Sequence, residues 1–326
     1  QEAIDRGKQF MLVEEYFSTT ALLGAVLTHV EKNGDKAGSK PIYVIPENEG
    51  AEVDGQYADF IRAKIKRVTH KAFEIYSPFL EDLIYSEDKE WMDMIINTLI
   101  LGDLVRLSPS YHREAILSEV FEAIERKAVD LYWIKNITER VSALVDGLRD
   151  GKRVLTVGDP FLLFNDRMNN FNFRQLEQRN IRLIYTPLSE YYLMFWKDHA
   201  DFNGKNGDEN FKRNISTLKE KIELISEIMG ENSNIDDDYP RLKGLADEHI
   251  GYYSGMNGRY RYAKVHSDAL LTDGIITVSS MYENTGIMLN ILKNDKLLSK
   301  PVLNLTFDGN KNENDRMKIE SFIYYI

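Results

Sequence analysis

The chain has 326 residues, of which 43% are hydrophobic and 29% charged, ordinary values for a globular protein. Its formal net charge of −11 argues against nucleic acid as a partner, because phosphate binding needs a basic face. The sequence contains no cysteine, which excludes disulfides, thiolate nucleophiles and cysteine-held zinc or iron–sulfur sites within the chain. It also contains no run of 18 apolar residues, so we expect no membrane-spanning helix and a cytoplasmic location.

The two ends of the chain have the character of interior sequence. The first residues, QEAIDRGKQF, lack the charged and apolar regions of a signal peptide. The last residues, ESFIYYI, are apolar. We therefore expect a segment of a longer polypeptide.

Residues 1–125 are predicted to form a first α/β lobe. STTALLGAVLTHVEKNG has helical spacing, and we expect Ser18 or Thr19 to cap this helix and Gly34 to end it. Apolar and β-branched runs predict strands at 40–47 and 73–80, with an amphipathic helix at 56–72 between them. Helical patterns follow at 88–107 and 111–151, and we assign 126–150 to a connecting helix.

Residues 151–326 are predicted to form a second α/β lobe with a helical insertion at about 205–262. Strands at 154–157, 181–186, 274–278 and 300–309 alternate with helices, an order typical of parallel strands. Within the insertion we expect the acidic IDDDYPRLKG to be a solvated loop and IGYYSGMNGRYRYAKV to be a surface helix and loop. The fold class is therefore α/β, with two flavodoxin- or Rossmann-like lobes that long helices join and flank.

Three loops are candidate sites because they lie at predicted strand ends or helix starts: residues 14–20, 50–57 and 279–286. VGDPFLLFN is a lone glycine turn, in which we expect Asp159 to cap the next segment. It lacks the G-x-G-x-x-G spacing of a dinucleotide site, and no G-x-x-x-x-G-K loop occurs. The six histidines form no metal-binding signature. We therefore expect neither a nicotinamide cofactor nor ATP hydrolysis.

The three loops, in this order, resemble those of the 2-hydroxyacyl-CoA dehydratase and benzoyl-CoA reductase subunit family. The closest resemblance is to the dehydratase-like segment of large acyl-CoA dehydratase activase-related proteins, the activators of 2-hydroxyglutaryl-CoA dehydratase. EYFSTTALLG matches a family loop of the form EC-x-P…G, GAEVDGQY matches GPCRFGQY, and DGIITVSSMYENTG matches DGVINVSPFNCMPG. VLTVGDPFLLFNDRMNN and VLNLTFDG are similar to two further family motifs, so the resemblance covers almost the whole chain.

In that family the three loop cysteines hold a 4Fe-4S cluster between the lobes. An ATP-hydrolysing activase supplies an electron for the dehydration of an acyl-CoA thioester. The resemblance implies that Tyr16, Glu52 and Glu283 occupy the former cluster-ligand positions, with no cluster or other cofactor within this chain. It also implies a candidate ligand cleft, formed by Gly50, Gly55, Gln56, Tyr57, Gly158, Asp159, Asn165 and Gly286.

Three functions are compatible with these residues. The first is a non-catalytic, cluster-less module that docks to an activase module or a homologous dehydratase subunit, in the same polypeptide or another. The second is a dehydratase-related lyase subunit whose acyl-CoA cleft is lined by Tyr191–Trp196 and Gly158–Asn165. The third is a divalent-metal site at Glu52 and Glu283, because carboxylates suit Mg²⁺, Mn²⁺ or Ca²⁺ better than a sulfide cluster. We favour the first and expect no bound metal.

Overall fold

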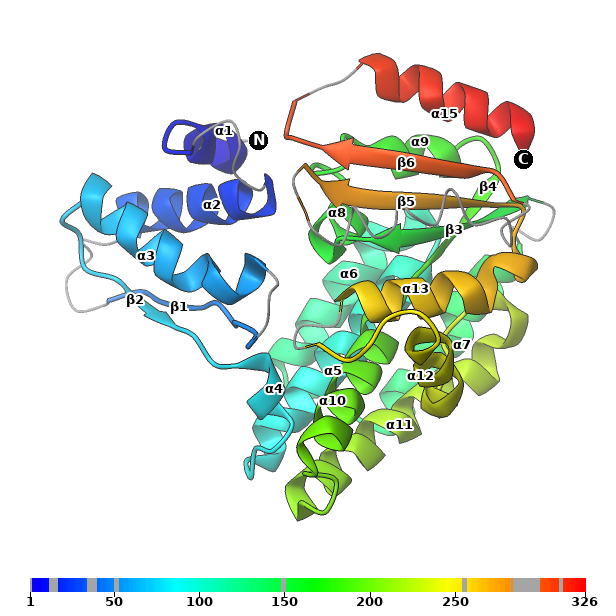
Figure 1. The fold of residues 1–326 in the computed structure, drawn as a ribbon, viewed down its shortest axis with the longest axis horizontal. Helices are drawn as coiled ribbons and strands as arrows, with labels where there is room; N and C mark the ends of the chain where they lie inside the picture. The colour runs from blue at the N-terminus through cyan, green and yellow to red at the C-terminus, as the bar shows by residue number, and fades with distance from the viewer. Residues whose placement is uncertain are drawn as a thin grey trace.

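The computed structural model describes residues 2–11, 17–33, 40–49, 53–147, 151–253, 257–281, 283, 300–310 and 313–326. Figure 1 shows a small first lobe beside a larger second one, with a layer of helices beneath the second lobe's sheet. The described strands form two sheets, and every strand pair is parallel. The α/β fold class predicted from the sequence is confirmed.

The first lobe packs helices on one face of a two-stranded sheet. Its elements are α1 (Glu2–Lys8), α2 (Phe17–Asn33), β1 (Ile42–Val44), η1 (Val53–Gln56), α3 (Tyr57–Val68) and β2 (Glu74–Tyr76). Leu23, Leu27, Ile61 and Ile65 are fully buried between these elements because they recur at helical spacing along α2 and α3. The other face of the sheet leaves Ile42, Val44 and Tyr76 exposed.

The second lobe is built on a four-stranded sheet covered on both faces. Its strands are β3 (Lys152–Gly158), β4 (Ile181–Tyr185), β5 (Gly274–Ser280) and β6 (Val302–Phe307). They lie in the order β4-β3-β5-β6, which matches the start of the flavodoxin-like strand order. One face packs on α8 (Pro160–Phe164), α9 (Asn172–Glu177) and α15 (Glu313–Tyr325), and the other on α13 (Asn257–Asp268). Burial on both faces explains the nearly continuous apolar runs of β3 and β5.

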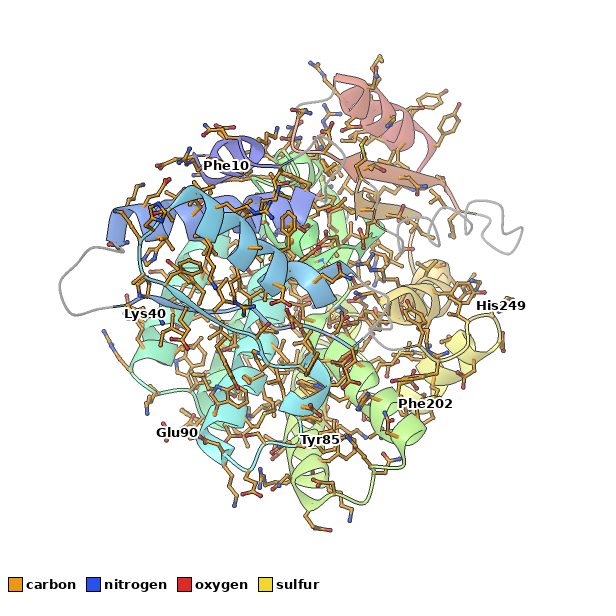
Figure 2. All side chains as sticks on the ribbon, turned by 60° about the vertical axis from the view of Figure 1, so that its left-hand side comes forward. Phe10, Lys40, Tyr85, Glu90, Phe202 and His249 are labelled. Carbon is orange, nitrogen blue, oxygen red and sulfur yellow. The ribbon has the colours of Figure 1, made fainter. Side chains whose placement is uncertain are left out.

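The remaining helices form a layer with a single shared core. This layer contains α4 (Leu80–Leu83), α5 (Lys89–Leu107), α6 (Ser110–Glu125), α7 (Leu131–Asp146), α10 (Leu188–Asn203), α11 (Glu209–Met229) and α12 (Tyr239–Asp247). The short turn η2 (Gly230–Asn232) follows α11, and η3 (Ala269–Leu271) follows α13 beside the sheet. Tyr85, labelled in Figure 2, follows α4 and stacks on Phe211 with 5.6 Å between ring centroids. The core thus groups α5 and α6 with helices of the second lobe, although the pattern of the sequence predicts a first lobe that extends to residue 125. No helix in the described part of the chain is long and apolar enough to cross a membrane.

Four local expectations differ from the structure. The helix predicted over 111–151 is two helices, because Lys127 adopts a left-handed conformation with φ 52° and Asp130 caps α7. The predicted loop IDDDYPRLKG contains most of α12, whose first turn is capped by Asp238. The predicted surface helix α13 is buried, with Arg259 and Lys264 each 0% exposed. Finally, Ser18 and Thr19 lie inside the first turn of α2, not at its cap.

Candidate functional site

The ends of β3 and β5 form the natural ligand position of the second lobe. Within the sheet, β3 lies between β4 and β5. The chain continues from β3 to β4, whereas β5 lies on the opposite edge of β3, so the loops that follow β3 and β5 diverge. Ligands of open parallel sheets bind at such a switch point, outside the carboxyl ends of the strands. Gly158 allows the two strand ends to meet, because a Cβ at this position would lie 1.9 Å from the carbonyl oxygen of Val278. The next residue, Asp159, therefore lies directly beside the end of β5.

Asp159 joins three segments that are far apart in the sequence. Its Oδ1 accepts a hydrogen bond of 2.8 Å from the backbone N–H of Phe161, which confirms the predicted cap of the segment after β3. Its Oδ2 accepts from the hydroxyls of Ser18 at 2.7 Å and Ser280 at 2.9 Å. Since Ser18 lies in the first turn of α2 and Ser280 ends β5, this one carboxyl group connects the first lobe to the sheet of the second.

The Asp159 carboxyl group is protonated more readily than an ordinary aspartate. Burial raises its pKa to about 6, and the nearby charge of Glu283 acts in the same direction. The donors Ser18 and Ser280, together with the charge of Arg261, favour the ionised form and limit the shift. Around neutral pH the side chain is therefore mostly ionised, within about one pH unit of its midpoint.

Glu283, the third residue of the expected ligand set, forms a buried ion pair. Its Oε1 accepts from Nη1 of Arg261 at 2.6 Å, and its Oε2 accepts from the backbone N–H of Ser280 at 3.1 Å. The side chains of Arg261 and Glu283 are 5% and 9% exposed. Arg261 comes from α13, on the opposite face of the sheet from α8. The carboxylate is thus neutralised and oriented by groups of this chain.

A cleft of about 580 Å³ opens between the lobes above these groups. The first lobe contributes Leu22, Val44 and Tyr57 to its walls, and α5 contributes Leu99. The second lobe and its helices contribute Pro160, Phe161, Phe164, Asn165, Leu188, Tyr191, Tyr192 and Asn257, with Asp159, Arg261, Ser280 and Glu283 also lining the cleft. A mostly apolar cavity with a few convergent polar groups is the usual composition of a small-molecule site.

The predicted cleft residues occupy different positions relative to this cavity. Tyr57, Asp159 and Asn165 line it, and Gly158 lines a smaller hollow that shares Pro160 and Arg261 with it. Gly55 instead packs against the backbone of Asn48, where a Cβ would approach the carbonyl oxygen to 2.6 Å, and its neighbour Gln56 is not part of the lining. Of the predicted aromatic wall, Tyr191 and Tyr192 face the cleft, whereas Phe195 and Trp196 are buried in the helical layer.

Several predicted positions lie outside the described residues: Tyr16, Gly50, Glu52 and Gly286. Of the three positions expected from the resemblance, Tyr16, Glu52 and Glu283, the structure therefore describes Glu283. Within the described ranges, no group of three histidine, aspartate or glutamate side chains is arranged to hold a metal ion. The predicted metal pair of Glu52 and Glu283 is not tested, but its described member is already engaged by Arg261.

One residue of the site, Arg261, lies outside the loops that the sequence predicts as candidate sites, whereas Ser18 and Ser280 lie within the loops 14–20 and 279–286. The local pattern predicts a helix cap at Ser18 and a surface segment around Arg261. The available signal for Arg261 was its position in NGRYRYAK, where cations alternate with aromatic and small residues. Such a helix buries its cations when neighbouring elements supply acidic partners. Lys264, for example, forms an ion pair of 2.8 Å with Glu190 of α10.

The chain was compared with protein-family models, with curated proteins and with solved structures, and it matches none of them.

Proposed function

We propose that this chain is a cluster-less module of the 2-hydroxyacyl-CoA dehydratase type, which carries out no redox chemistry itself and acts as the partner of an ATP-dependent activase. The proposal rests on the loop motifs of the sequence and on one structural observation. Where the resembling family has its third cluster cysteine, Glu283 pairs with Arg261 at 2.6 Å. An arginine that neutralises a buried carboxylate competes with any cation for the same oxygens.

Purification and binding experiments test this function. After anaerobic purification of the full chain we expect no stoichiometric iron or acid-labile sulfide. We also expect saturable binding to a dehydratase activase that differs between its ATP and ADP states. A stoichiometric cluster, or no binding to the activase in any nucleotide state, would contradict the proposal.

The interlobe cleft supports a second candidate function, the binding of an acyl thioester. Its volume of about 580 Å³ and its aromatic and aliphatic walls suit an apolar acyl chain, with the charged residues Asp159, Arg261 and Glu283 near a polar end group. If the cleft binds acyl thioesters, acyl-CoA thioesters should raise the melting temperature of the protein more than free CoA does. An unchanged melting temperature across thioesters of different chain length would exclude it.

A pair of variants on α5 makes that measurement specific to the cleft. Leu99→Arg places a charge on the apolar wall and should reduce thioester affinity by at least about tenfold, since a buried unpaired charge costs more than 1.4 kcal/mol. Met94→Arg introduces the same charge on the same helix, at a side chain that is 48% exposed and outside the cleft lining. It should leave the affinity unchanged. Equal losses in both variants would show that the ligand binds elsewhere.

A further inference from the structure

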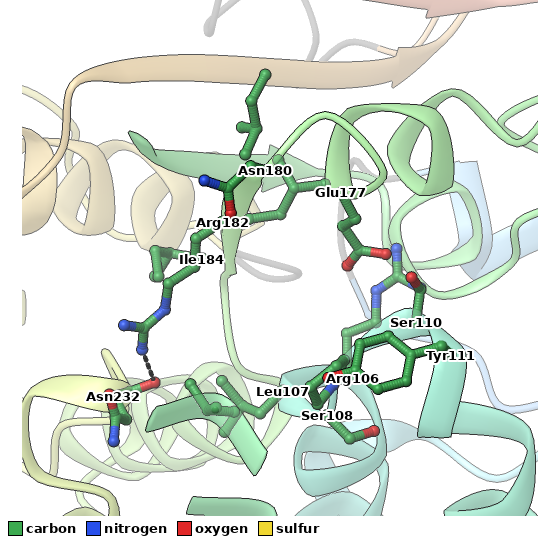
Figure 3. Close-up of a pocket in the computed structure, with 14 residues that line it drawn as sticks. Arg106, Leu107, Ser108, Ser110, Tyr111, Glu177, Asn180, Arg182, Ile184 and Asn232 are labelled. Carbon is green, nitrogen blue, oxygen red and sulfur yellow. Dashed lines mark hydrogen bonds between the residues drawn. The ribbon is translucent and has the colours of Figure 1, made fainter. Parts of the chain in front are cut away.

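The sheet of the second lobe has two edge strands, and helices cover one of them, β4. Figure 3 shows Leu107 of α5 and Tyr111 of α6 across a pocket from Arg182 of β4. The pocket measures about 70 Å³, which is room for a few waters and not for a further strand. Arg182 also donates a hydrogen bond of 2.7 Å to the backbone carbonyl of Asn232. The β4 edge is therefore closed to strand pairing.

The opposite edge strand, β6, presents a row of backbone groups for pairing. Figure 1 shows β6 as the outermost strand, and among the described strands its partner is β5 alone. The backbone carbonyls of Pro301 and Phe307 each accept a hydrogen bond of 2.9 Å from the β5 side, so the odd-numbered residues of β6 turn toward β5. Because successive residues of a strand alternate in direction, the N–H and C=O groups of Val302, Asn304 and Thr306 point to the free edge. A row of this kind is a template for another strand.

The two ends of β6 carry opposite charges. Lys300 lies two residues before the strand and Asp308 follows it directly, whereas the strand itself, VLNLTF, contains no charged residue. Asp308 accepts a 2.8 Å hydrogen bond from the backbone N–H of Asn310, and Lys8 lies near it, but the side chain stays exposed. Edge strands that avoid pairing commonly carry a lysine or another charge within the strand. Here the charges instead attract an antiparallel copy of the same strand.

Helix α15 adds an exposed apolar surface beside this edge. Its buried side reaches over the start of β5, since a Cβ at Gly274 would lie 2.7 Å from the Phe322 ring. Its other side leaves Met317 64% and Tyr325 70% exposed. These two side chains line an open hollow of about 800 Å³ that continues to Val302 at the edge of the sheet. The helix therefore covers the face of the sheet and leaves its edge accessible.

We propose that β6 is the contact between two copies of this chain, which pair antiparallel across a twofold axis at Asn304 and join their sheets. In this register Val302 lies opposite Thr306 of the partner subunit, so the outward-facing backbone groups of both strands are paired. The same register brings Lys300 next to Asp308 of the partner subunit. Each contact occurs twice, because a twofold interface is isologous. A register displaced by two residues would separate these charges.

The same arrangement covers the exposed side of α15. A twofold axis perpendicular to the sheet keeps both copies of α15 on one face of the joined sheet. The sides that carry Met317 and Tyr325 then face each other across the axis, and the hollow next to them lies inside the interface. The contact shares no residue with the lining of the interlobe cleft, so it does not depend on the proposed function.

Sedimentation velocity of the full chain over a concentration series tests this contact. We expect a reversible equilibrium between monomer and dimer. Lys300→Glu should raise the dissociation constant at least about tenfold, because it replaces two attractive charge pairs by two repulsive ones, and Asp308→Lys should do the same. The double variant Lys300→Glu/Asp308→Lys exchanges the charges and should restore most of the affinity. Arg126→Glu, a charge reversal at a side chain that is 75% exposed at the end of α6, is the control and should leave the dissociation constant unchanged.

A backbone variant tests the strand pairing itself. Thr306→Pro removes an N–H group that points to the free edge, a position at which edge strands tolerate proline. This variant should keep the circular dichroism of the folded chain and lose the dimer. A chain that stays monomeric at about 100 μM, above the micromolar range of specific interfaces, overturns the proposal and leaves the edge to a strand of another protein. A dimer that Thr306→Pro leaves intact, or one that the charge exchange does not restore, also overturns it.

Discussion

Arg261 and Glu283 form a buried ion pair at the switch point. Both side chains are removed from water, and the pair is completed by the backbone N–H of Ser280. Desolvation offsets much of the attraction within a buried pair, but removal of one partner leaves a charge that nothing compensates. The pair should therefore be more sensitive to single substitutions than to the loss of both charges.

Arg261→Ala should lower the free energy of unfolding by about 3 kcal/mol, because the buried Glu283 carboxylate loses its guanidinium partner. Urea unfolding at pH 7 measures this change. The double variant Arg261→Ala/Glu283→Gln should recover part of the loss, since a neutral amide is less costly to bury. Arg126→Ala, at an exposed pair with Glu122, is the control and should change stability by less than about 0.5 kcal/mol. Equal effects of Arg261→Ala and Arg126→Ala would contradict the inferred role of the buried pair.

Residues whose role is local were predictable from the sequence, and residues whose role is long-range were not. The cap formed by Asp159 depends on the two residues that follow it, and the prediction was confirmed. The bonds of the same carboxyl group to Ser18 and Ser280 span 141 and 121 residues of sequence. They depend on the packing of α2 against the ends of β3 and β5, which no local pattern encodes.

At the scale of secondary-structure elements, helix breaks were the least predictable feature. The pattern over 111–151 has helical periodicity throughout, so periodicity alone did not reveal the break between α6 and α7. The decisive signal is the sequence Lys127–Asp130, in which Asp130 accepts a 2.8 Å hydrogen bond from the backbone N–H of Trp133. An aspartate three residues before a tryptophan is a weak cap signal when the surrounding residues are all compatible with a helix.

Asp130→Ala should lower the free energy of unfolding by about 1 kcal/mol, because the first turn of α7 loses its cap. Asp130→Asn keeps an acceptor at the same position and should restore most of that stability. Both values come from chemical denaturation followed by circular dichroism. If alanine and asparagine are equivalent at this position, the side chain does not act as a cap.

The start of α2 contacts the second lobe through the Ser18 hydroxyl, which bonds to Asp159, and through Phe17, which packs in the core of the sheet. Ser18→Ala should lower stability by about 1–2 kcal/mol, because Asp159 loses a charge-assisted hydrogen bond in a buried site. Hydrogen exchange should also become faster in the first turns of α2 than in β3. Ser142→Ala, whose hydroxyl makes only a long 3.4 Å contact with the carbonyl of Ile228, is the control. Uniform acceleration of exchange throughout the chain would indicate a global effect and not a loosened contact between the lobes.

At the scale of the whole molecule, the alternation of strands and helices was sufficient to predict two parallel α/β units. It was not sufficient to assign the helices between them. The fully buried residues Ile96, Ile100 and Leu104 of α5 lie in one core with Trp196 and Leu218. A buried helix has apolar residues around most of its circumference, so its sequence does not identify the lobe against which it packs.

The stability of the whole molecule should decrease as the pH rises from 5 to 7.5. Burial is the main cause that raises the pKa of Asp103 and Asp159 to about 6 and that of Glu190 to about 7. In the unfolded chain these groups lose their protons near 3.8 and 4.5, so over this pH range the folded state binds more protons than the unfolded state. Burial is the main cause that lowers the pKa of His199, so protonation of this side chain destabilises the fold as the pH falls below about 6.5. This effect is opposite in sign to that of the three carboxyl groups, but it comes from one group.

Asp159→Asn isolates one of these contributions. The amide oxygen can still accept from the N–H of Phe161, while the titrating charge is absent. Each unit of pKa shift corresponds to about 1.4 kcal/mol, so a shift from 3.8 to about 6 corresponds to at most about 3 kcal/mol of pH-dependent stability. Urea unfolding at pH 5 and pH 7.5 should therefore show a smaller loss of stability in Asp159→Asn than in the unmodified chain. Identical losses in the two proteins would mean that Asp159 titrates as an ordinary carboxyl group in the folded state, contrary to its burial between the lobes.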